Sequence, residues 1–221
     1  MALFLFFIVF AILTAMTLLY LIRHGRTAWN NDGRMQGWAD PGLDALGRQQ
    51  ARALARRLYS ESFAAFYSSP LARARETAEA VAAGHNMPVI YDDRLRERNL
   101  GEWTGLTFAE AQARNPEQAM DDWRIPGPPG GESQAELMAR MAAALDDIAA
   151  RHAQSTVGVF SHGGALSAYM EHLLGIPVGR PVSFSFHNTA IARVSLRQGH
   201  GQGYHVRVLS LGDDHHLTGL T

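Results

Sequence analysis

Hydrophobic and polar residues alternate along this chain with two different periods, which predict helices and strands in turn. Segments whose apolar residues recur every three or four positions, with charged residues between them, are typical of helices that cover a core. Short apolar and β-branched runs that end at glycine, proline or serine are typical of buried strands. The predicted helices cover residues 46–59, 70–83, 132–150 and 165–174. The predicted strands cover residues 17–22, 63–67, 88–91, 156–160, 190–196 and 204–211.

Turn residues mark the boundaries of several of these elements. Ser69 followed by Pro70 suits the N-cap and first turn of the second helix, and the glycine- and proline-rich residues 127–131 precede the third. The last two strands, separated by the glycine-rich residues 198–203, are predicted to pair antiparallel. Because helices otherwise alternate with strands, the sequence predicts a single α/β domain with a mostly parallel sheet sandwiched by helices.

The amino-terminal segment has no charged residue from Ala2 to Ile22. Since residues 17–22 are already predicted as a strand, residues 2–15 would reach only about 21 Å as a helix, which is short for crossing a bilayer. Three interpretations of residues 1–15 stay open: a mis-assigned start with translation beginning at Met16, a membrane anchor, or a cleaved signal. The domain itself is predicted to cover residues 16–221.

The composition of the 221 residues narrows the classes of function. A hydrophobic content of 47% with 19% charged residues is typical of a folded core, not of a disordered chain. Twenty Lys and Arg against 21 Asp and Glu give a net charge of −1, so no overall basic field attracts nucleic acid. The absence of cysteine excludes disulfides, thiolate nucleophiles and cysteine-bound metals. Acid–base chemistry therefore falls to His, Glu and Asp, and any anion site must be local.

Two of the predicted strands lead directly into a histidine and a glycine turn. Strand 17–22 continues as Arg23-His24-Gly25, and strand 156–160 continues as Ser161-His162-Gly163-Gly164. Ligands of open α/β sheets bind beyond the carboxyl ends of the strands, so we expect both imidazoles to face one crevice. Arg23, together with Arg73 at the start of the next helix, can supply bidentate donors to an anion. The pattern predicts a cationic site that fits a phosphate group.

Five segments in chain order resemble the histidine phosphatase superfamily, which includes the phosphoglycerate mutases. The first is Leu21-Ile-Arg-His-Gly-Arg-Thr27, followed by Trp29 and Asn30. The others are Gly37-Trp-Ala-Asp40 with Leu43 and Gly47, Ser69-Pro-Leu-Ala-Arg-Ala-Arg-Glu-Thr-Ala78, Leu95-Arg-Glu97 with Gly101-Glu-Trp-Thr-Gly105, and Ser161-His-Gly-Gly164. The similarity extends over about residues 17–215 and implies a phosphoglycerate mutase-like fold. The modest length of residues 111–131 resembles the cofactor-independent, broad-specificity phosphatases, because the mutases carry a longer insertion there.

The resemblance also implies a role for each candidate site residue. His24 corresponds to the nucleophile that forms a phosphohistidine, and Glu97 to the proton donor of the leaving oxygen and later the base for water. The cationic phosphate pocket corresponds to Arg23, Arg73 and His162. Asn30, Gln36 and Gly163 match, less specifically, positions that contact phosphate or substrate in the family. No cofactor and no metal is implied, and the polar residues 213–216 are interpreted as a solvated tail.

Several alternatives stay open at the level of the sequence. Taken alone, Arg73 is also compatible with a solvated helix face, Glu97 with a surface charge cluster, and the four tryptophans with packing. The expected function is a phosphomonoesterase that acts on small phosphorylated metabolites; the alternatives are a phosphoglycerate mutase and an inactive phospho-ligand-binding module. The expected location is cytoplasmic, with membrane contact only if residues 1–15 are an anchor, and a homodimer is compatible with the sequence.

Overall fold

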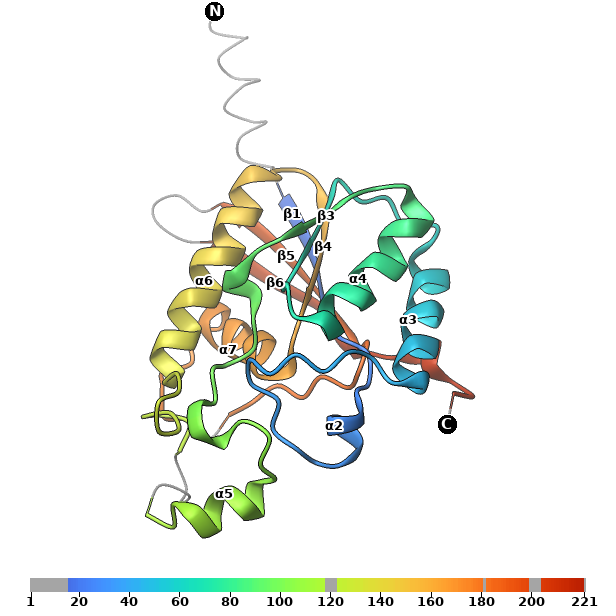
Figure 1. The fold of residues 1–221 in the computed structure, drawn as a ribbon. Helices are drawn as coiled ribbons and strands as arrows, with labels where there is room; N and C mark the ends of the chain where they lie inside the picture. The colour runs from blue at the N-terminus through green and yellow to red at the C-terminus, as the bar shows by residue number, and fades with distance from the viewer. Residues whose placement is uncertain (1–15, 118–122, 181, 199–203, 221) are drawn as a thin grey trace, which may run out of the picture.

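The computed structural model describes residues 16–117, 123–180, 182–198 and 204–220, so the interpretations of residues 1–15 lie outside the described residues. Within these ranges, six strands form a single sheet (Figure 1). The strands are β1 (Met16–Arg23), β2 (Ala65–Ser68), β3 (Val89–Tyr91), β4 (Thr156–Ser161), β5 (Ile191–Gln198) and β6 (Tyr204–Asp213). The helices are α2 (Ala28–Asn31), α3 (Ala45–Leu58), α4 (Ala72–His85), α5 (Phe108–Arg114), α6 (Gln134–Arg151) and α7 (Gly163–Leu173). The 3₁₀ turns are η1 (Asp93–Leu95), η2 (Gly101–Trp103) and η3 (His215–Leu217).

The order of the strands confirms the predicted α/β fold. The order is β3-β2-β4-β1-β5-β6, in which the first four strands are parallel to one another and β5 runs antiparallel to both of its neighbours, β1 and β6. In the register of β1 and β4, Arg23 lies opposite Ser161. The next residue of each strand is a histidine, so the topology places His24 and His162 side by side.

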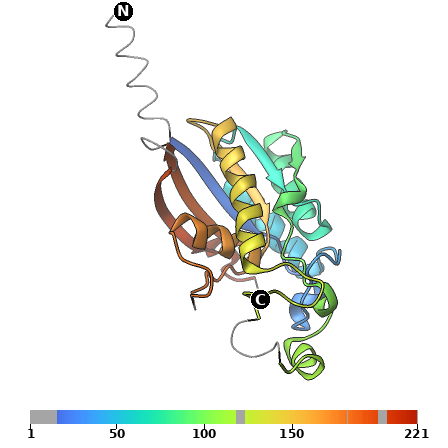
Figure 2. The same cartoon turned by 90° about the vertical axis from the view of Figure 1, so that its left-hand side faces the viewer.

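Helices cover both faces of the sheet, as the alternating side chains of β1 show. Leu19 and Leu21 pack in a core cluster with α6 and α7, whereas Tyr20 and Ile22 pack with α3 and α4 on the opposite face (Figures 1 and 2). Successive residues of a strand point to opposite faces, so an uninterrupted apolar run is buried on both sides. The prediction of a sheet sandwiched by helices is confirmed.

Some boundaries differ from the sequence prediction. The second helix begins at Ala72, not at Ser69-Pro70, because the backbone of Leu71 is still extended and makes Leu71 the N-cap. The hydroxyl of Ser69 contacts a side chain of the site described below. The helix predicted from residue 132 begins at Gln134, where Ser133 and Glu136 form a capping box. The short helices α2 and α5 were not predicted, since four and seven residues are too few for a helical period.

The carboxyl-terminal residues are less solvated than the sequence suggested. Thr189 Oγ1 and His216 Nε2 lie 3.0 Å apart, and His187 pairs with Asp214 at 2.8 Å. These contacts tie the segment after β6 to the loop that leads into β5. In the part of the chain that the structure describes, no helix has the length and apolar character needed to cross a membrane.

Candidate active site

The site is built around two histidines at the carboxyl ends of adjacent strands. His24 and His162 are buried, and their ring centroids lie 5.1 Å apart at an interplanar angle of 58°. The turn after His24 needs a glycine, because a Cβ on Gly25 would lie 2.7 Å from the carbonyl oxygen of Gly47. The two imidazoles lie side by side as expected, but of the two only His24 lines the site cavity described below.

The tautomer of His24 is defined by its contact with the main chain. His24 Nδ1 lies 2.7 Å from the carbonyl oxygen of Gly25. A carbonyl oxygen only accepts hydrogen bonds, so Nδ1 carries the proton and Nε2 keeps its lone pair. Burial, reinforced by the charges of Arg73 and Arg23, holds the pKa of His24 well below its usual 6.5. The ring is therefore a neutral imidazole with an unprotonated Nε2 at neutral pH.

Arg73 projects from the first turn of α4 and is fully buried. Its Nη1 and Nη2 donate to the carbonyl oxygens of Ala39 and Gly37 at 2.7 and 2.8 Å, and Nε donates to His162 Nδ1 at 3.2 Å. Burial lowers the pKa of Arg73 to about 10, so the side chain remains a cation at neutral pH. These contacts hold the guanidinium plane in one orientation beside the two histidines.

His162 has protein partners on both ring nitrogens. Nδ1 accepts from Arg73, and Nε2 lies 2.9 Å from Ser69 Oγ. Burial is the largest cause that lowers the pKa of His162 well below 6.5, and the neighbouring Arg73 adds to it. With Nδ1 accepting, the proton of the neutral ring is on Nε2 and is donated to Ser69.

Arg23 supplies the second guanidinium of the site. Its Nη1 donates to the carbonyl oxygen of Phe186 at 2.6 Å. Its Nε is buried and has no hydrogen-bond partner among the described residues. A buried donor without a partner is unfavourable, and an anionic ligand would satisfy it.

Glu97 lies at the amino-terminal end of α7. Its carboxylate accepts from the backbone N–H of Arg98 at 2.8 Å, Gly164 at 3.1 Å and Ala165 at 2.9 Å. A Cβ on Gly164 would lie 2.7 Å from Glu97 Oε1, so glycine is needed for this approach. The carboxylate is thereby directed by main-chain donors of a helix end, not by a side-chain counter-ion.

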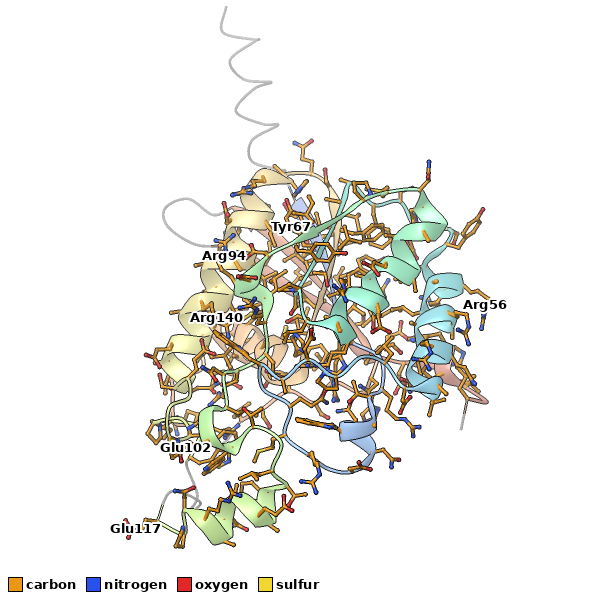
Figure 3. The ribbon with its side chains drawn as sticks, in the orientation of Figure 1. Arg56, Tyr67, Arg94, Glu102, Glu117 and Arg140 are labelled. Carbon is orange, nitrogen blue, oxygen red and sulfur yellow. The ribbon has the colours of Figure 1, made fainter. Side chains whose placement is uncertain are left out.

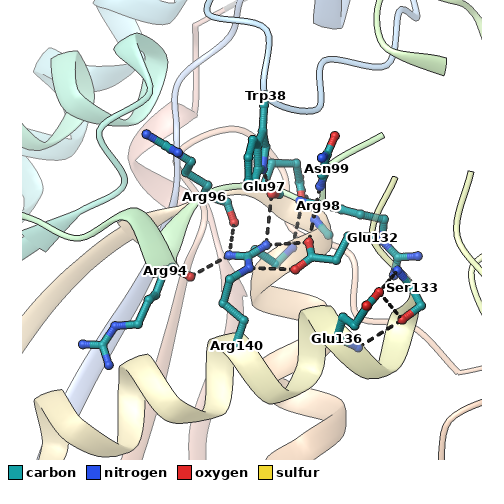
Figure 4. Close-up of polar contacts among 12 residues, drawn as sticks. Trp38, Arg94, Arg96, Glu97, Arg98, Asn99, Glu132, Ser133, Glu136 and Arg140 are labelled. Carbon is teal, nitrogen blue, oxygen red and sulfur yellow. Dashed lines mark hydrogen bonds and ion pairs between the residues drawn. The ribbon is translucent and has the colours of Figure 1, made fainter. Parts of the chain in front are cut away.

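Arg140 of α6, which Figure 3 labels, holds the main chain that carries Glu97 (Figure 4). Its guanidinium donates to the carbonyl oxygens of Arg94 at 2.6 Å, Arg96 at 3.0 Å and Glu97 at 3.2 Å. The same group pairs with both oxygens of Glu132 at 2.7 and 2.6 Å. Trp38 Nε1 also donates to the carbonyl oxygen of Glu97, at 2.7 Å.

Most of the predicted site residues line a cavity of about 260 Å³. Its lining includes Arg23, His24, Asn30, Gln36, Arg73 and Glu97. Asn30 Oδ1 accepts from Thr27 N at 3.1 Å, which leaves the amide NH₂ of Asn30 as the group that can donate to a ligand. Gln36 is buried, and its Oε1 has no partner among the residues that the structure describes. Gly163 instead lines a neighbouring cavity, where a Cβ added to this glycine would lie 3.6 Å from Arg23 Nε.

Sequence reasoning missed several residues that organise this site. The sequence predicts Ser69 as a helix cap, and it indicates no role for Glu132 and Arg140 beyond the helix of residues 132–150. Two of the tryptophans have different surroundings. Trp123 lines this cavity and the neighbouring one, whereas Trp103 is fully buried and packs against the ring of Trp123. The Ser-Pro block that carries Arg73 is the available signal for Ser69, because the two residues lie only four positions apart in the sequence.

Comparisons with known proteins identify the family. The model of the histidine phosphatase superfamily (branch 1) matches residues 19–208. The chain therefore belongs to the histidine phosphatase superfamily, a family of enzymes that includes phosphatases.

Individual relatives are similar over most of the chain. Phosphoserine phosphatase 1 of Hydrogenobacter thermophilus is 34% identical over 83% of this chain and 88% of its own. The "Probable phosphoglycerate mutase GpmB" of Yersinia enterocolitica is 34% identical over 90% of this chain and 94% of its own. A solved mycobacterial glucosyl-3-phosphoglycerate phosphatase, in complex with VO3, has a TM-score of 0.79 and 32% identity, covering 88% of this chain and 98% of that one.

Proposed function

We propose that this protein is a phosphomonoesterase that hydrolyses small phosphorylated metabolites through a phosphohistidine at His24. The observation that carries the proposal is the contact of His24 Nδ1 with the Gly25 carbonyl at 2.7 Å, which leaves Nε2 unprotonated beside two arginines. A neutral imidazole nitrogen held next to fixed cations is suited to attack the phosphorus of a bound phosphate.

In the first step, the Nε2 lone pair of His24 forms a bond to phosphorus as the bond from phosphorus to the ester oxygen breaks. Glu97, protonated at this stage, gives its proton to the departing oxygen, so that an alcohol leaves. Arg23 and Arg73 offset the negative charge of the non-bridging oxygens. Asn30, Gln36, Gly163 and His162 are proposed as further contacts to phosphate or substrate.

In the second step, water attacks the phosphohistidine and transfers a proton to the Glu97 carboxylate. The bond between phosphorus and Nε2 breaks, and inorganic phosphate leaves with His24 again neutral. One carboxylate thus acts as acid and then as base, and the cycle needs no cofactor. We further propose that the protein is one of the broad-specificity, cofactor-independent phosphatases.

The decisive experiment is to trap the intermediate. Wild-type protein mixed with p-nitrophenyl phosphate and quenched at alkaline pH, where phosphohistidine survives, is expected to carry the phosphoryl group on His24 by mass spectrometry. His24→Ala should lose both the intermediate and turnover, whereas the matched control His205→Ala removes an exposed imidazole on β6. Turnover by a folded His24→Ala protein would refute the proposal.

A phosphoglycerate mutase is the second candidate, supported by the relatives that carry this name. A mutase must return the phosphoryl group to a second hydroxyl before water reaches it. With 3-phosphoglycerate, release of inorganic phosphate supports hydrolysis, and formation of 2-phosphoglycerate without release supports the mutase.

A further inference from the structure

The loop that leads into β5 contacts the end of β1 through several neighbouring residues. The carbonyl oxygen of Phe186 accepts from the side chain of Arg23 at 2.6 Å. The backbone N–H of Thr189 donates to the carbonyl oxygens of Arg23 and His24 at 3.1 and 3.2 Å. The side-chain amide of Asn188 donates to the same carbonyl oxygen of His24 at 3.0 Å. The loop is therefore bonded directly to the residue proposed as the nucleophile.

The backbone of this loop is strained at Thr189. This residue is fully buried and has a φ of +58°, in the left-handed region that β-branched residues rarely adopt. Its Oγ1 contacts His216 Nε2 at 3.0 Å, and His187 pairs with Asp214 at 2.8 Å. A strained conformation persists only where the surrounding structure holds it. The carboxyl-terminal segment thus makes the loop a fixed support beside His24.

The contacts of Asn188 define which end of its amide faces Asn30. The backbone N–H of Thr27 can only donate, so the atom of Asn30 that it contacts at 3.1 Å is the oxygen. That oxygen and the carbonyl oxygen of His24 are both acceptors, and they lie 3.4 and 3.0 Å from the same nitrogen of Asn188. Asn188 therefore donates to both, and the NH₂ group of Asn30 is left for the cavity that His24 lines.

Asn188 links the side chain of Asn30 to the nucleophile. In the part of the chain that the structure describes, the other hydrogen bonds of the Asn30 side chain both go to Thr27. They belong to the capping box of the four-residue helix α2, so they hold Asn30 within its own turn. The main chain of His24 is also held without Asn188, because its N–H donates to the carbonyl oxygen of Ser161 at 3.0 Å. Loss of Asn188 would therefore affect the placement of Asn30 more than that of His24.

We propose that Asn188 is a positioning residue, which ties the amide of Asn30 to the main chain of His24 so that the phosphate donor and the nucleophile keep one relative position. This inference rests on the phosphatase function proposed above, in which Asn30 contacts the phosphate. Asn188 acts through Asn30 and does not touch the substrate. A misplaced donor lowers both the affinity for phosphate and the rate of attack at phosphorus.

A double-mutant cycle tests whether Asn188 acts through Asn30. Asn188→Ala removes the orienting amide, and Asn30→Ala removes the group that it orients. For each single variant we expect kcat/KM for p-nitrophenyl phosphate to fall by about tenfold, and Kd for inorganic phosphate to rise by about the same factor. The double variant should stay within about twofold of Asn30→Ala, whereas independent effects would multiply to about 100-fold.

Two further variants separate orientation from stability. Asn188→Leu keeps approximately the size of the side chain but cannot donate, so it should weaken phosphate binding as Asn188→Ala does. The matched control is Asn31→Ala, which removes an exposed amide from the same short helix, where it contacts only Asp32 among the described residues. This control should leave kcat/KM and phosphate affinity unchanged. A purely structural role of Asn188 would lower Tm without changing the phosphate affinity of the folded protein.

The outcomes separate this inference from the function on which it rests. Losses that multiply in the cycle, or an unchanged phosphate affinity in folded Asn188→Ala, overturn the positioning role while the phosphatase function stands. If Asn188→Ala does not fold, the cycle is measured with Asn188→Leu. Failure of both variants to fold makes Asn188 a structural residue and overturns the proposal as well. No turnover of p-nitrophenyl phosphate by the wild type refutes the phosphatase function itself, and the cycle of phosphate Kd values then decides the role of Asn188.

Discussion

Arg73 and His162 are joined side chain to side chain, with Arg73 Nε donating to His162 Nδ1 at 3.2 Å. His162 Nε2 lies 2.9 Å from Ser69 Oγ, so in this arrangement the imidazole has no free N–H for a ligand. A hydroxyl can donate as well as accept. If Ser69 donates to Nε2, the proton of His162 moves to Nδ1, where it can bind phosphate once Arg73 Nε turns to the same anion.

Ser69→Ala is therefore expected to weaken phosphate binding. We expect KM for p-nitrophenyl phosphate, and the inhibition constant of inorganic phosphate, to rise by about tenfold with a smaller change in kcat, since one charge-assisted hydrogen bond is lost. The matched control is Ser68→Ala, because Ser68 is equally buried but its hydroxyl donates only to a backbone carbonyl. Phosphate inhibition equal to that of the wild type would contradict this role of Ser69.

The lowered pKa of His24 sets the direction of its pH dependence. The nucleophile must be neutral, and burial together with the two arginines keeps its pKa well below 6.5. As pH falls through 6.5, an ordinary histidine gains a proton, but His24 stays neutral until a lower pH. Titration of the imidazole signals by NMR, with His24→Ala to identify those of His24, should show no protonation of this ring at pH 6.5. Half-protonation at or above pH 6.5 would contradict the expected direction.

The two arginines are expected to provide the positive charge that divalent ions provide in other phosphatases. Turnover in EDTA should equal turnover without it. Arg73→Lys keeps the charge but cannot contact Ala39, Gly37 and His162 at once, so we expect kcat/KM for p-nitrophenyl phosphate to fall by about 10²-fold. Inhibition by EDTA that a divalent ion reverses would disprove the metal-independent mechanism.

Arg140 offers a test of how Glu97 is positioned. Arg140→Met removes the contacts with the carbonyl oxygens of residues 94, 96 and 97 and leaves Glu132 without its ion-pair partner. We expect a lower Tm and a larger loss of kcat/KM for an alkyl phosphate than for p-nitrophenyl phosphate, because only the alkyl ester needs the proton of a well-placed acid.

The double variant Arg140→Met/Glu132→Gln distinguishes positioning from stability. Removing the unpaired carboxylate should restore part of the lost Tm. The preference for p-nitrophenyl phosphate should persist, because the carbonyl contacts stay broken. If the preference disappears together with the stability loss, Arg140 has only a structural role.

The sequence predicted the central part of this fold because the relevant signals are local. The apolar run of β1 and the Arg23-His24-Gly25 turn lie next to each other in the chain, as do β4 and His162. The parallel register that pairs Arg23 with Ser161 then brings the histidines together. The antiparallel pair of β5 and β6 was predictable for the same reason, because the two strands follow each other closely in the sequence.

The supporting contacts could not be predicted in the same way, because they join distant parts of the chain. Arg140 lies 43 residues from Glu97, and an arginine on an amphipathic helix is ordinarily a solvated side chain. Gln134 bonds Glu171 across 37 residues, and neither has a local pattern that indicates burial. Only the fold shows which polar residues of a helix turn inward.

Glu97 is the last residue whose role can be isolated, and leaving-group chemistry separates acid catalysis from binding. An alkyl alcohol leaves poorly without a proton, whereas p-nitrophenol departs readily as an anion. Glu97→Gln should therefore lower kcat/KM for an alkyl phosphate by about 10²–10⁴-fold and affect p-nitrophenyl phosphate much less. Loss of the base in the second step can equalise steady-state kcat, so the comparison uses kcat/KM or single-turnover phosphorylation of His24.

Two further variants complete this test of Glu97. Gly164→Ala keeps the carboxylate but places a Cβ 2.7 Å from its Oε1, so it should displace Glu97 and reproduce the selective loss on alkyl esters. Glu102→Gln removes an exposed carboxylate five residues away and serves as the matched control. If Glu97→Gln lowers kcat/KM for both esters by the same factor, Glu97 does not protonate the leaving group. In that case its bonds to the N–H groups of Gly164 and Ala165 serve only to hold the start of α7 in place.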